Sequence, residues 1–86
     1  MDPYDVILHP IITEVSSRIL EAENKIVFAV NLKASKEEIK RAVEELYEVK
    51  VEKVTTVVTS KGVKKAFVRL HPDYKAVDIA IKLGVI

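Results

Sequence analysis

The feature that most constrains this chain is a pair of strand-forming segments joined by a very short connection. Residues 54–59 and 63–70 are rich in β-branched and aromatic residues, which fit a pleated, half-buried strand. Between them lie only Ser60, Lys61 and Gly62, and glycine adopts a positive φ without steric cost. We therefore predict an antiparallel hairpin with a three-residue turn that ends at Gly62.

This turn length sets the register of the hairpin, and the register sorts the side chains between two faces. With Thr59 opposite Val63, successive residues alternate between the faces, and a slip of one residue would exchange them. One face is apolar and is expected to join the core; it carries Val54, Thr56, Val58, Ala66, Val68 and Leu70. The other face is basic with one aromatic ring; it carries Lys53, Thr55, Val57, Lys65, Phe67 and Arg69.

A basic strand face of this kind has two interpretations. Lysine and arginine bind phosphates, and an aromatic ring stacks on a base or a sugar, so the face fits a nucleic-acid surface. Charged residues on an outer strand face are also common in proteins that bind no nucleic acid. The hairpin pattern by itself leaves both interpretations open.

Composition narrows the class of protein. The 86 residues are expected to form a single domain, residues 1–86, with a small core. The absence of cysteine excludes disulfides and thiolate metal sites within the sequence. No apolar run is long enough to span a membrane and no signal peptide is recognisable, so we expect no membrane span and a cytoplasmic location.

Charge is unevenly distributed along the chain, although the net charge is only +1. Residues 1–24 contain five acidic side chains and one arginine, whereas residues 50–70 contain six basic side chains and one glutamate. A small domain with an acidic end and a basic hairpin can meet two different partners.

The acidic end of the chain is expected to hold an edge strand and a short helix. Residues 4–8 are apolar and are followed by a His-Pro pair, at which the proline ends the strand. Thr13 is a suitable N-cap for a helix that continues to about Ala22. Val15 and Ile19 lie four positions apart on this helix and are expected to face the core.

The rest of the chain alternates between strands and helices. Residues 25–31 are apolar at both alternating sets of positions, which indicates a central strand covered on both faces. Ser35 and Glu38 form a capping box for an amphipathic helix over residues 36–47. The next strand covers residues 49–59.

A change of phase near Lys53 suggests a β-bulge in the strand over residues 49–59. After Leu70, Asp73 is expected to cap a last helix that ends before Gly84. The resulting order, β-α-β-α-β-β-α, predicts an α+β fold with helices on both faces of its sheet.

The sequence contains no recognisable catalytic or metal-binding constellation. His9 and His71 are far apart and each precedes a proline, and there is neither a His-x-x-His pair nor an acidic ligand loop. The serines have no neighbouring base, and two glycines leave little room for a phosphate-binding loop. No enzymatic activity, metal or cofactor is expected.

Several segments, in the right order, resemble the L23 family of large-subunit ribosomal proteins in its archaeal form. Residues 64–71, with Ile79 after them, resemble the family signature, and residues 4–14 resemble its opening segment. Further similar segments lie at residues 24–28, 38–46 and 78–84.

This resemblance implies a structural constituent of the large ribosomal subunit in the cytoplasm, rather than an enzyme. The family has a small α+β fold with an antiparallel four-stranded sheet. It binds domain III of the large-subunit rRNA beside the polypeptide exit tunnel, and its neighbour there is ribosomal protein L29. It also offers a docking surface to exit-site factors such as the signal recognition particle.

The resemblance also implies roles for particular residues. Four positions match the family signature, two lysines support them, and together they are the expected rRNA contacts: Lys53, Lys61, Lys64, Lys65, Phe67 and Arg69. Three positions match the factor-docking surface: Glu14, Tyr47 and Glu48.

Three features of the sequence depart from the family pattern. Val15 stands where the family usually has a lysine, so the first helix lacks a cation expected to contact rRNA. Glu48 stands where many relatives have glycine. Bacterial members carry a long hairpin loop that reaches into the tunnel; residues 60–62 are too few to do so, which favours an archaeal source.

Two other classes of protein remain as alternatives. One is a free ferredoxin-like interaction domain that dimerises through its sheet and has no affinity for RNA. The other is a small acylphosphatase-like enzyme, which needs a phosphate-binding loop and a positioned arginine; the scarcity of glycine argues against it.

Overall fold

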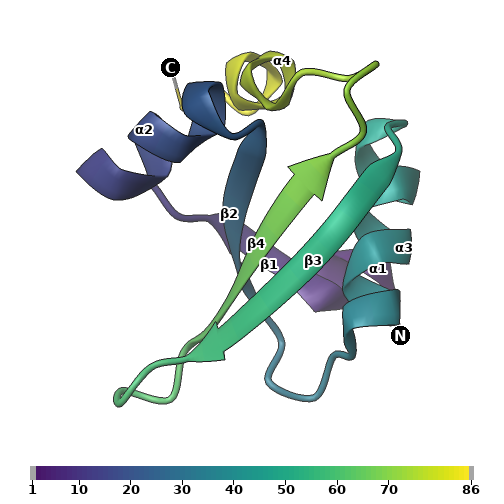
Figure 1. The fold of residues 1–86 in the computed structure, drawn as a ribbon. Coiled ribbons are helices and arrows are strands. Elements are labelled where there is room, and N and C mark those ends of the chain that lie inside the picture. The colour runs from purple at the N-terminus through teal and green to yellow at the C-terminus, as the bar shows by residue number, and fades with distance from the viewer. Residues whose placement is uncertain (1, 86) are drawn as a thin grey trace.

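One antiparallel sheet, with its strands in the order β1-β2-β4-β3, organises the fold (Figure 1). The structure is a computed structural model that describes residues 2–85. The elements are α1 (Pro3–Val6), β1 (Ile7–Pro10), α2 (Glu14–Ala22), β2 (Lys25–Val30), α3 (Lys36–Tyr47), β3 (Val51–Val58), β4 (Lys64–Leu70) and α4 (Ala76–Lys82). The predicted α+β class and element order are confirmed, with one additional short helix, α1.

The β3–β4 hairpin has the predicted turn and register. The Gly62 N–H donates to the Thr59 carbonyl at 3.0 Å, and Gly62 has a φ of 79°, which glycine adopts without strain. The Thr59 N–H donates to the Val63 carbonyl at 2.8 Å and so pairs these two residues. A register shift between Val51 and Lys53 marks the predicted β-bulge.

The core lies between one face of the sheet and helices α3 and α4. Phe28 of β2, Ile39 of α3 and Ile79 of α4 are all 2% exposed or less. The hairpin contributes four of its predicted core residues to this cluster: Val54, Ala66, Val68 and Leu70.

Val58 was predicted to lie in the core, but its side chain is 58% exposed. The alternation of side chains along β3 is as predicted. The hairpin, however, extends beyond the helices at its tip (Figure 1), so nothing in residues 2–85 covers this last position.

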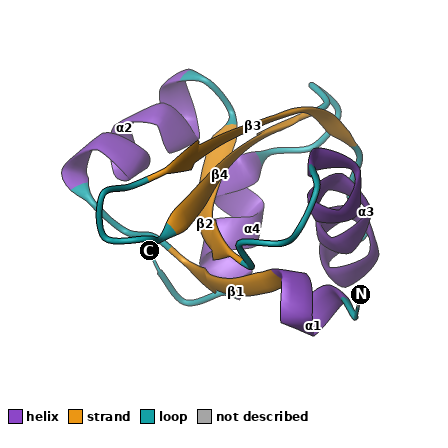
Figure 2. Ribbon diagram, turned by 90° about the horizontal axis from the view of Figure 1, so that it is seen from below, coloured by secondary structure: helices purple, strands orange, loops and turns teal. Residues whose placement is uncertain are grey.

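Strand β2 is buried on both faces, as its doubly apolar pattern predicted. Phe28 belongs to the core, while Val27 and Ala29, on the opposite face, are only 3% and 2% exposed. Helices α2 and α3 lie on opposite sides of the sheet (Figure 2). The prediction of helices on both faces is therefore confirmed.

The first strand begins later in the chain than the sequence predicted. Tyr4 and Val6 lie in helix α1, and β1 runs from Ile7 to Pro10. The Asp2 carboxylate accepts a hydrogen bond from the Tyr4 N–H at 2.9 Å, and a proline occupies the first turn. Both are helix-start signals, and here they outweigh the β propensity of the apolar run.

Helix α2 has the predicted cap and bounds but a different orientation. The Thr13 hydroxyl accepts from the Ser16 N–H at 3.1 Å, and the Ser16 hydroxyl accepts from the Thr13 N–H at 2.7 Å. Ser16 and Leu20 face the sheet, whereas Val15, about 100° further round the helix, is 58% exposed. The prediction that Val15 faces the core is therefore wrong.

The last helix is not capped by Asp73. Helix α4 begins at Ala76, whose N–H donates to the Asn24 side-chain oxygen at 2.7 Å. The Asn24 amide nitrogen also donates to the Tyr74 carbonyl at 2.8 Å. A residue before β2 thus caps a helix that begins 52 positions later and ties the start of α4 to the connection between α2 and β2.

Candidate nucleic-acid interface

The side of the β3–β4 hairpin that faces away from the core carries the predicted basic surface. Cross-strand pairing places Lys53 beside Arg69, Thr55 beside Phe67 and Val57 beside Lys65. Directly opposed side chains of this kind have their Cβ atoms roughly 4.5–5.5 Å apart. We call this surface the basic face, and it consists of Lys53, Thr55, Val57, Lys65, Phe67 and Arg69.

Strand β2 continues the three rows of the basic face, but its part of the surface is closed. Lys25 lies beside Arg69, Val27 beside Phe67 and Ala29 beside Lys65. Val27 and Ala29 are buried, and the Lys25 ammonium pairs with the Glu23 carboxylate at 3.1 Å. The accessible surface is therefore formed by β3 and β4.

The cations of the basic face are only partly neutralised. Within residues 2–85, neither Lys53 nor Lys65 has an ion-pair partner. The Arg69 Nε lies 3.6 Å from an oxygen of Glu52, and the two side chains are about half exposed. An exposed pair of this kind contributes little stability, so the guanidinium stays available for another anion.

The aromatic ring of the basic face differs from the aromatic ring of the core. Phe67 is partly exposed between Thr55 and Val27, whereas Phe28 is fully buried. A phenylalanine that is flanked by cations and partly accessible to solvent can stack on an unpaired base or a sugar. The face thus combines charges for phosphates with one ring for a base.

Two of the predicted contact residues lie outside this face. Lys61 sits in the exposed turn at the hairpin tip. Lys64 pairs with Val58 and points to the other side of the sheet, where its ammonium donates to the Ala34 carbonyl at 2.6 Å. The structure therefore groups Lys53, Lys65, Phe67 and Arg69 but separates Lys64 from them.

The three predicted docking residues do not share one surface. Glu14 is exposed at the start of α2 and lies 3.7 Å from the Arg18 guanidinium. Tyr47 and Glu48 lie at the end of α3, on the other side of the sheet (Figures 1 and 2). A single partner would have to reach around the molecule to contact all three.

Tyr47 has a structural role that its sequence position did not reveal. Its ring stacks on Phe28 with the centroids 5.8 Å apart and the planes at 11°. Burial, with a smaller contribution from Tyr4, raises the pKa of the Tyr47 phenol.

Glu48 ends helix α3 in the left-handed conformation, with a φ of 54°. This backbone region favours glycine, because a Cβ atom there approaches the following carbonyl oxygen. The geometry gives a physical reason for glycine at this position of a helix end.

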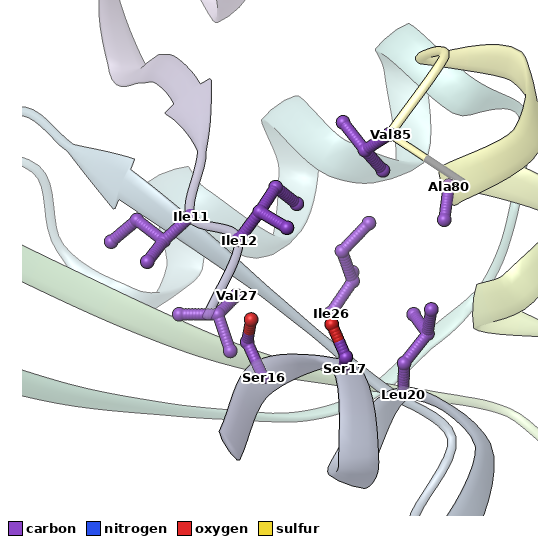
Figure 3. Close-up of a pocket in the computed structure, with 9 residues that line it drawn as sticks. All are labelled: Ile11, Ile12, Ser16, Ser17, Leu20, Ile26, Val27, Ala80 and Val85. Atoms are coloured by element: carbon purple, nitrogen blue, oxygen red, sulfur yellow. The ribbon is translucent and has the colours of Figure 1, made fainter. Parts of the chain in front are cut away.

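An open hollow of about 510 Å³ lies at the Arg69 end of the basic face, with Glu52 among its lining residues. A small apolar cavity of about 20 Å³ lies between α2, β2 and α4, with Leu20, Ile26 and Ala80 among its walls (Figure 3). This volume suits about one water molecule. Among residues 2–85, no three His, Asp or Glu side chains converge as metal ligands, and no helix is long and apolar enough to cross a membrane.

The small α+β fold and its basic, aromatic-containing sheet face fit a nucleic-acid-binding protein. Comparison with known proteins identifies the family to which the chain is similar. A family model described as ribosomal protein L23 matches residues 5–84. The large ribosomal subunit proteins uL23 of Methanothermobacter thermautotrophicus and Methanococcus aeolicus are 47% and 45% identical over 85 residues, which are 99% of each chain.

The chain therefore belongs to the ribosomal protein L23 family. Both relatives are archaeal, in agreement with the predicted type. This family comprises structural proteins of the large ribosomal subunit rather than enzymes, so the site of action is the ribosome in the cytoplasm. The acylphosphatase-like alternative is thereby set aside.

Proposed function

We propose that the chain binds domain III of the large-subunit rRNA, beside the polypeptide exit tunnel, through the basic face of its β3–β4 hairpin. The main observation in support of this proposal is the arrangement of Lys53, Lys65 and Arg69 around the partly exposed ring of Phe67. Two of these three cations have no ion-pair partner within the described chain. Such a surface is stabilised when it meets phosphates.

The residues of the face have different roles in this mechanism. Lys53 and Lys65 act as point charges that displace counterions from phosphates. Arg69 offers a planar fork that can bind one phosphate through two N–H groups. Phe67 stacks on an unpaired base or a sugar, while the core behind β4 keeps the strand in place.

The hairpin tip has a limited role in the proposed complex. The turn of residues 60–62 is tight, so this hairpin has no extended loop that could line the tunnel. Lys61 adds positive charge near the RNA at the tip. Lys64 holds the loop before α3 through the Ala34 carbonyl instead of contacting RNA.

We also propose that the acidic helix ends face exit-site factors, including the signal recognition particle, and that ribosomal protein L29 is a neighbour. Glu14 and Glu48 are exposed carboxylates, which are poor neighbours for phosphates. Because they lie on opposite sides of the sheet, we assign them to two separate contacts.

Single variants of the two acidic positions test this assignment. Glu14→Gln and Glu48→Gln should each leave incorporation into the large subunit intact. At least one of them should weaken binding of the signal recognition particle to the assembled subunit. Loss of incorporation would show that the carboxylate faces the RNA side, and unchanged factor binding in both variants would contradict the docking role.

RNA binding is tested with the double variant Lys65→Glu/Arg69→Glu and a folded transcript of rRNA domain III. We expect the wild-type protein to bind this transcript in preference to an unrelated RNA, and the variant to lose roughly 100-fold or more in affinity. The matched variant Arg41→Glu/Lys82→Glu places the same charge change on the exposed sides of α3 and α4, away from the basic face, and should bind normally. Equal binding by both variants, or a dimer with no affinity for RNA, would contradict the proposal.

A further inference from the structure

An open groove lies at the hairpin end of the sheet, beyond the basic face. Strand β4 pairs with β2 only as far as Lys64 and Val30, after which the hairpin and the loop before α3 diverge (Figure 1). The groove has a volume of about 450 Å³, and its walls include Leu8 of β1, Leu32 of the loop and Val63 of the hairpin.

The groove is rimmed by exposed aliphatic side chains. Leu8 is 55%, Leu32 56% and Val63 43% exposed. Val58, which pairs with Lys64 of the groove lining, is 58% exposed. Several large aliphatic residues gathered at one end of a small protein indicate a surface that another molecule covers.

The chemistry of this groove differs from that of the basic face. Of the side chains on which unpaired bases stack, its lining includes one histidine, His9, and no Phe, Tyr, Trp or Arg. Aliphatic side chains gain most when they pack against other apolar side chains, so the groove fits protein better than RNA.

The charges at the groove indicate the kind of protein segment that fits. His9, Lys33 and Lys64 line it, and no carboxylate does. Within residues 2–85, the Lys33 ammonium has no ion-pair partner, and Lys64 retains N–H donors beyond the one bonded to Ala34. A partner with carboxylates beside its apolar side chains would complement this rim.

We propose that the groove binds a short amphipathic segment of another protein of the large subunit, with apolar side chains in the groove and Asp or Glu at its lysine rim. The proposal rests on the proposed function, since it assumes assembly into the subunit. It assigns the hairpin two surfaces: the basic face, which meets RNA, and the groove side at Val63, which meets protein.

Site-specific photocrosslinking in purified, assembled large subunits tests this assignment. The crosslinker p-benzoylphenylalanine replaces Val63 or Leu32 in the groove, Thr55 in the basic face, or Ile81, which is exposed on α4 and lies outside both surfaces. We expect the Val63 and Leu32 positions to give protein crosslinks. The crosslinked peptide, identified by mass spectrometry, should contain apolar residues flanked by Asp or Glu.

The other positions separate this proposal from the RNA-binding proposal. Crosslinking from Thr55 should go to rRNA, and its absence would contradict the basic face while leaving the groove test valid. Crosslinks from Val63 and Leu32 to RNA, to a basic peptide, or at no higher yield than from Ile81 would overturn the groove proposal.

A charge variant examines the lysine rim. With the crosslinker at Val63, Lys33→Glu should lower the yield of the protein crosslink roughly tenfold, the change that corresponds to about 1.4 kcal/mol. Lys36→Glu introduces the same charge three residues later, outside the groove, and should leave the yield unchanged. An equal yield in both variants would overturn the assignment of carboxylates to the partner.

Discussion

The two faces of the β3–β4 hairpin are built from the same two strands, yet they have opposite properties. On one face, Ala66 and Val68 are fully buried beneath the helices. On the other, the alternating residues Lys65 and Arg69 remain accessible. Because successive side chains of a strand point to opposite faces, residues that stabilise the fold alternate with residues that are available to a partner.

The two phenylalanines make this comparison quantitative, because one residue type occupies both faces. Phe28→Ala empties a fully buried site and removes the stacking partner of Tyr47, so we expect a loss of ~3–5 kcal/mol in the free energy of unfolding. Phe67→Ala truncates a partly exposed ring and should cost much less stability. It should instead lower the affinity for rRNA, with one stacked base worth ~1–3 kcal/mol.

Urea denaturation and RNA titration of both variants measure these effects. Phe67→Leu serves as a control, since it keeps an apolar side chain but removes the aromatic ring. If Phe67→Ala destabilised the protein as much as Phe28→Ala and bound RNA normally, Phe67 would belong to the core and not to the interface.

Asn24 belongs to neither face and should affect both. Asn24→Gly keeps the positive φ of 54° accessible but removes the side-chain bonds to Tyr74 and Ala76. We expect a loss of ~1–3 kcal/mol in the free energy of unfolding. Asn24→Ala should cost a further ~1–2 kcal/mol, because alanine resists the left-handed conformation.

Hydrogen exchange at the α4 amides locates the effect of the Asn24 variants. Faster exchange there than in α3 would support the capping role. Equal exchange in the two helices would indicate that Asn24 acts only through global stability.

The features predicted correctly from sequence depend on neighbouring residues. Alternation and a glycine turn determine the hairpin register, and the Ser35–Glu38 box determines the start of α3. The cap of α4 could not be predicted in this way, because its acceptor, Asn24, lies 52 residues before Ala76. Local signals cannot indicate a bond that forms only after the sheet has assembled.

Glu48→Gly is expected to stabilise the folded protein without changing the basic face. Glycine removes the strain of a non-glycine residue at a φ of 54°, and we expect a gain of about 1 kcal/mol in the free energy of unfolding. Glu45→Gly, in the exposed interior of the same helix, should instead lose ~0.8–1.0 kcal/mol. A loss in both variants, measured by thermal denaturation, would show that the left-handed backbone is not strained.

The Tyr47 phenol should make stability fall at alkaline pH. Burial raises its pKa in the folded protein above the ordinary value of 10.0, so the folded state holds the proton more tightly than the unfolded state. The resulting stabilisation is fully present below about pH 10 and is lost as the pH rises through the folded-state pKa. Tyr47→Phe should leave stability at neutral pH nearly unchanged and make the alkaline decline shallower.

Urea midpoints across the alkaline range test the Tyr47 prediction. An identical decline in wild type and Tyr47→Phe would show that the phenol does not carry this pH dependence.

Strand alternation predicted which residues belong to the basic face. It could not predict contacts that side chains make with distant segments of the chain. Alternation alone places Lys65 and Arg69 together and puts Lys64 on the other face; the resemblance to the family added Lys64 to the expected contacts. Its bond to the Ala34 carbonyl joins two segments whose approach depends on the loop before α3. The separation of Glu14 from Tyr47 likewise follows from the sheet between their helices.

The salt dependence of binding to rRNA domain III tests the role of the basic face most directly. Phosphate contact by Lys53, Lys65 and Arg69 predicts that Lys53→Gln/Lys65→Gln/Arg69→Gln makes the slope of log affinity against log salt shallower, by roughly 0.7–0.9 per lost contact. The matched variant Lys33→Gln/Arg41→Gln/Lys82→Gln removes the same charge from exposed positions outside the basic face and should keep the wild-type slope. Equal slopes for the two variants would contradict binding through the basic face.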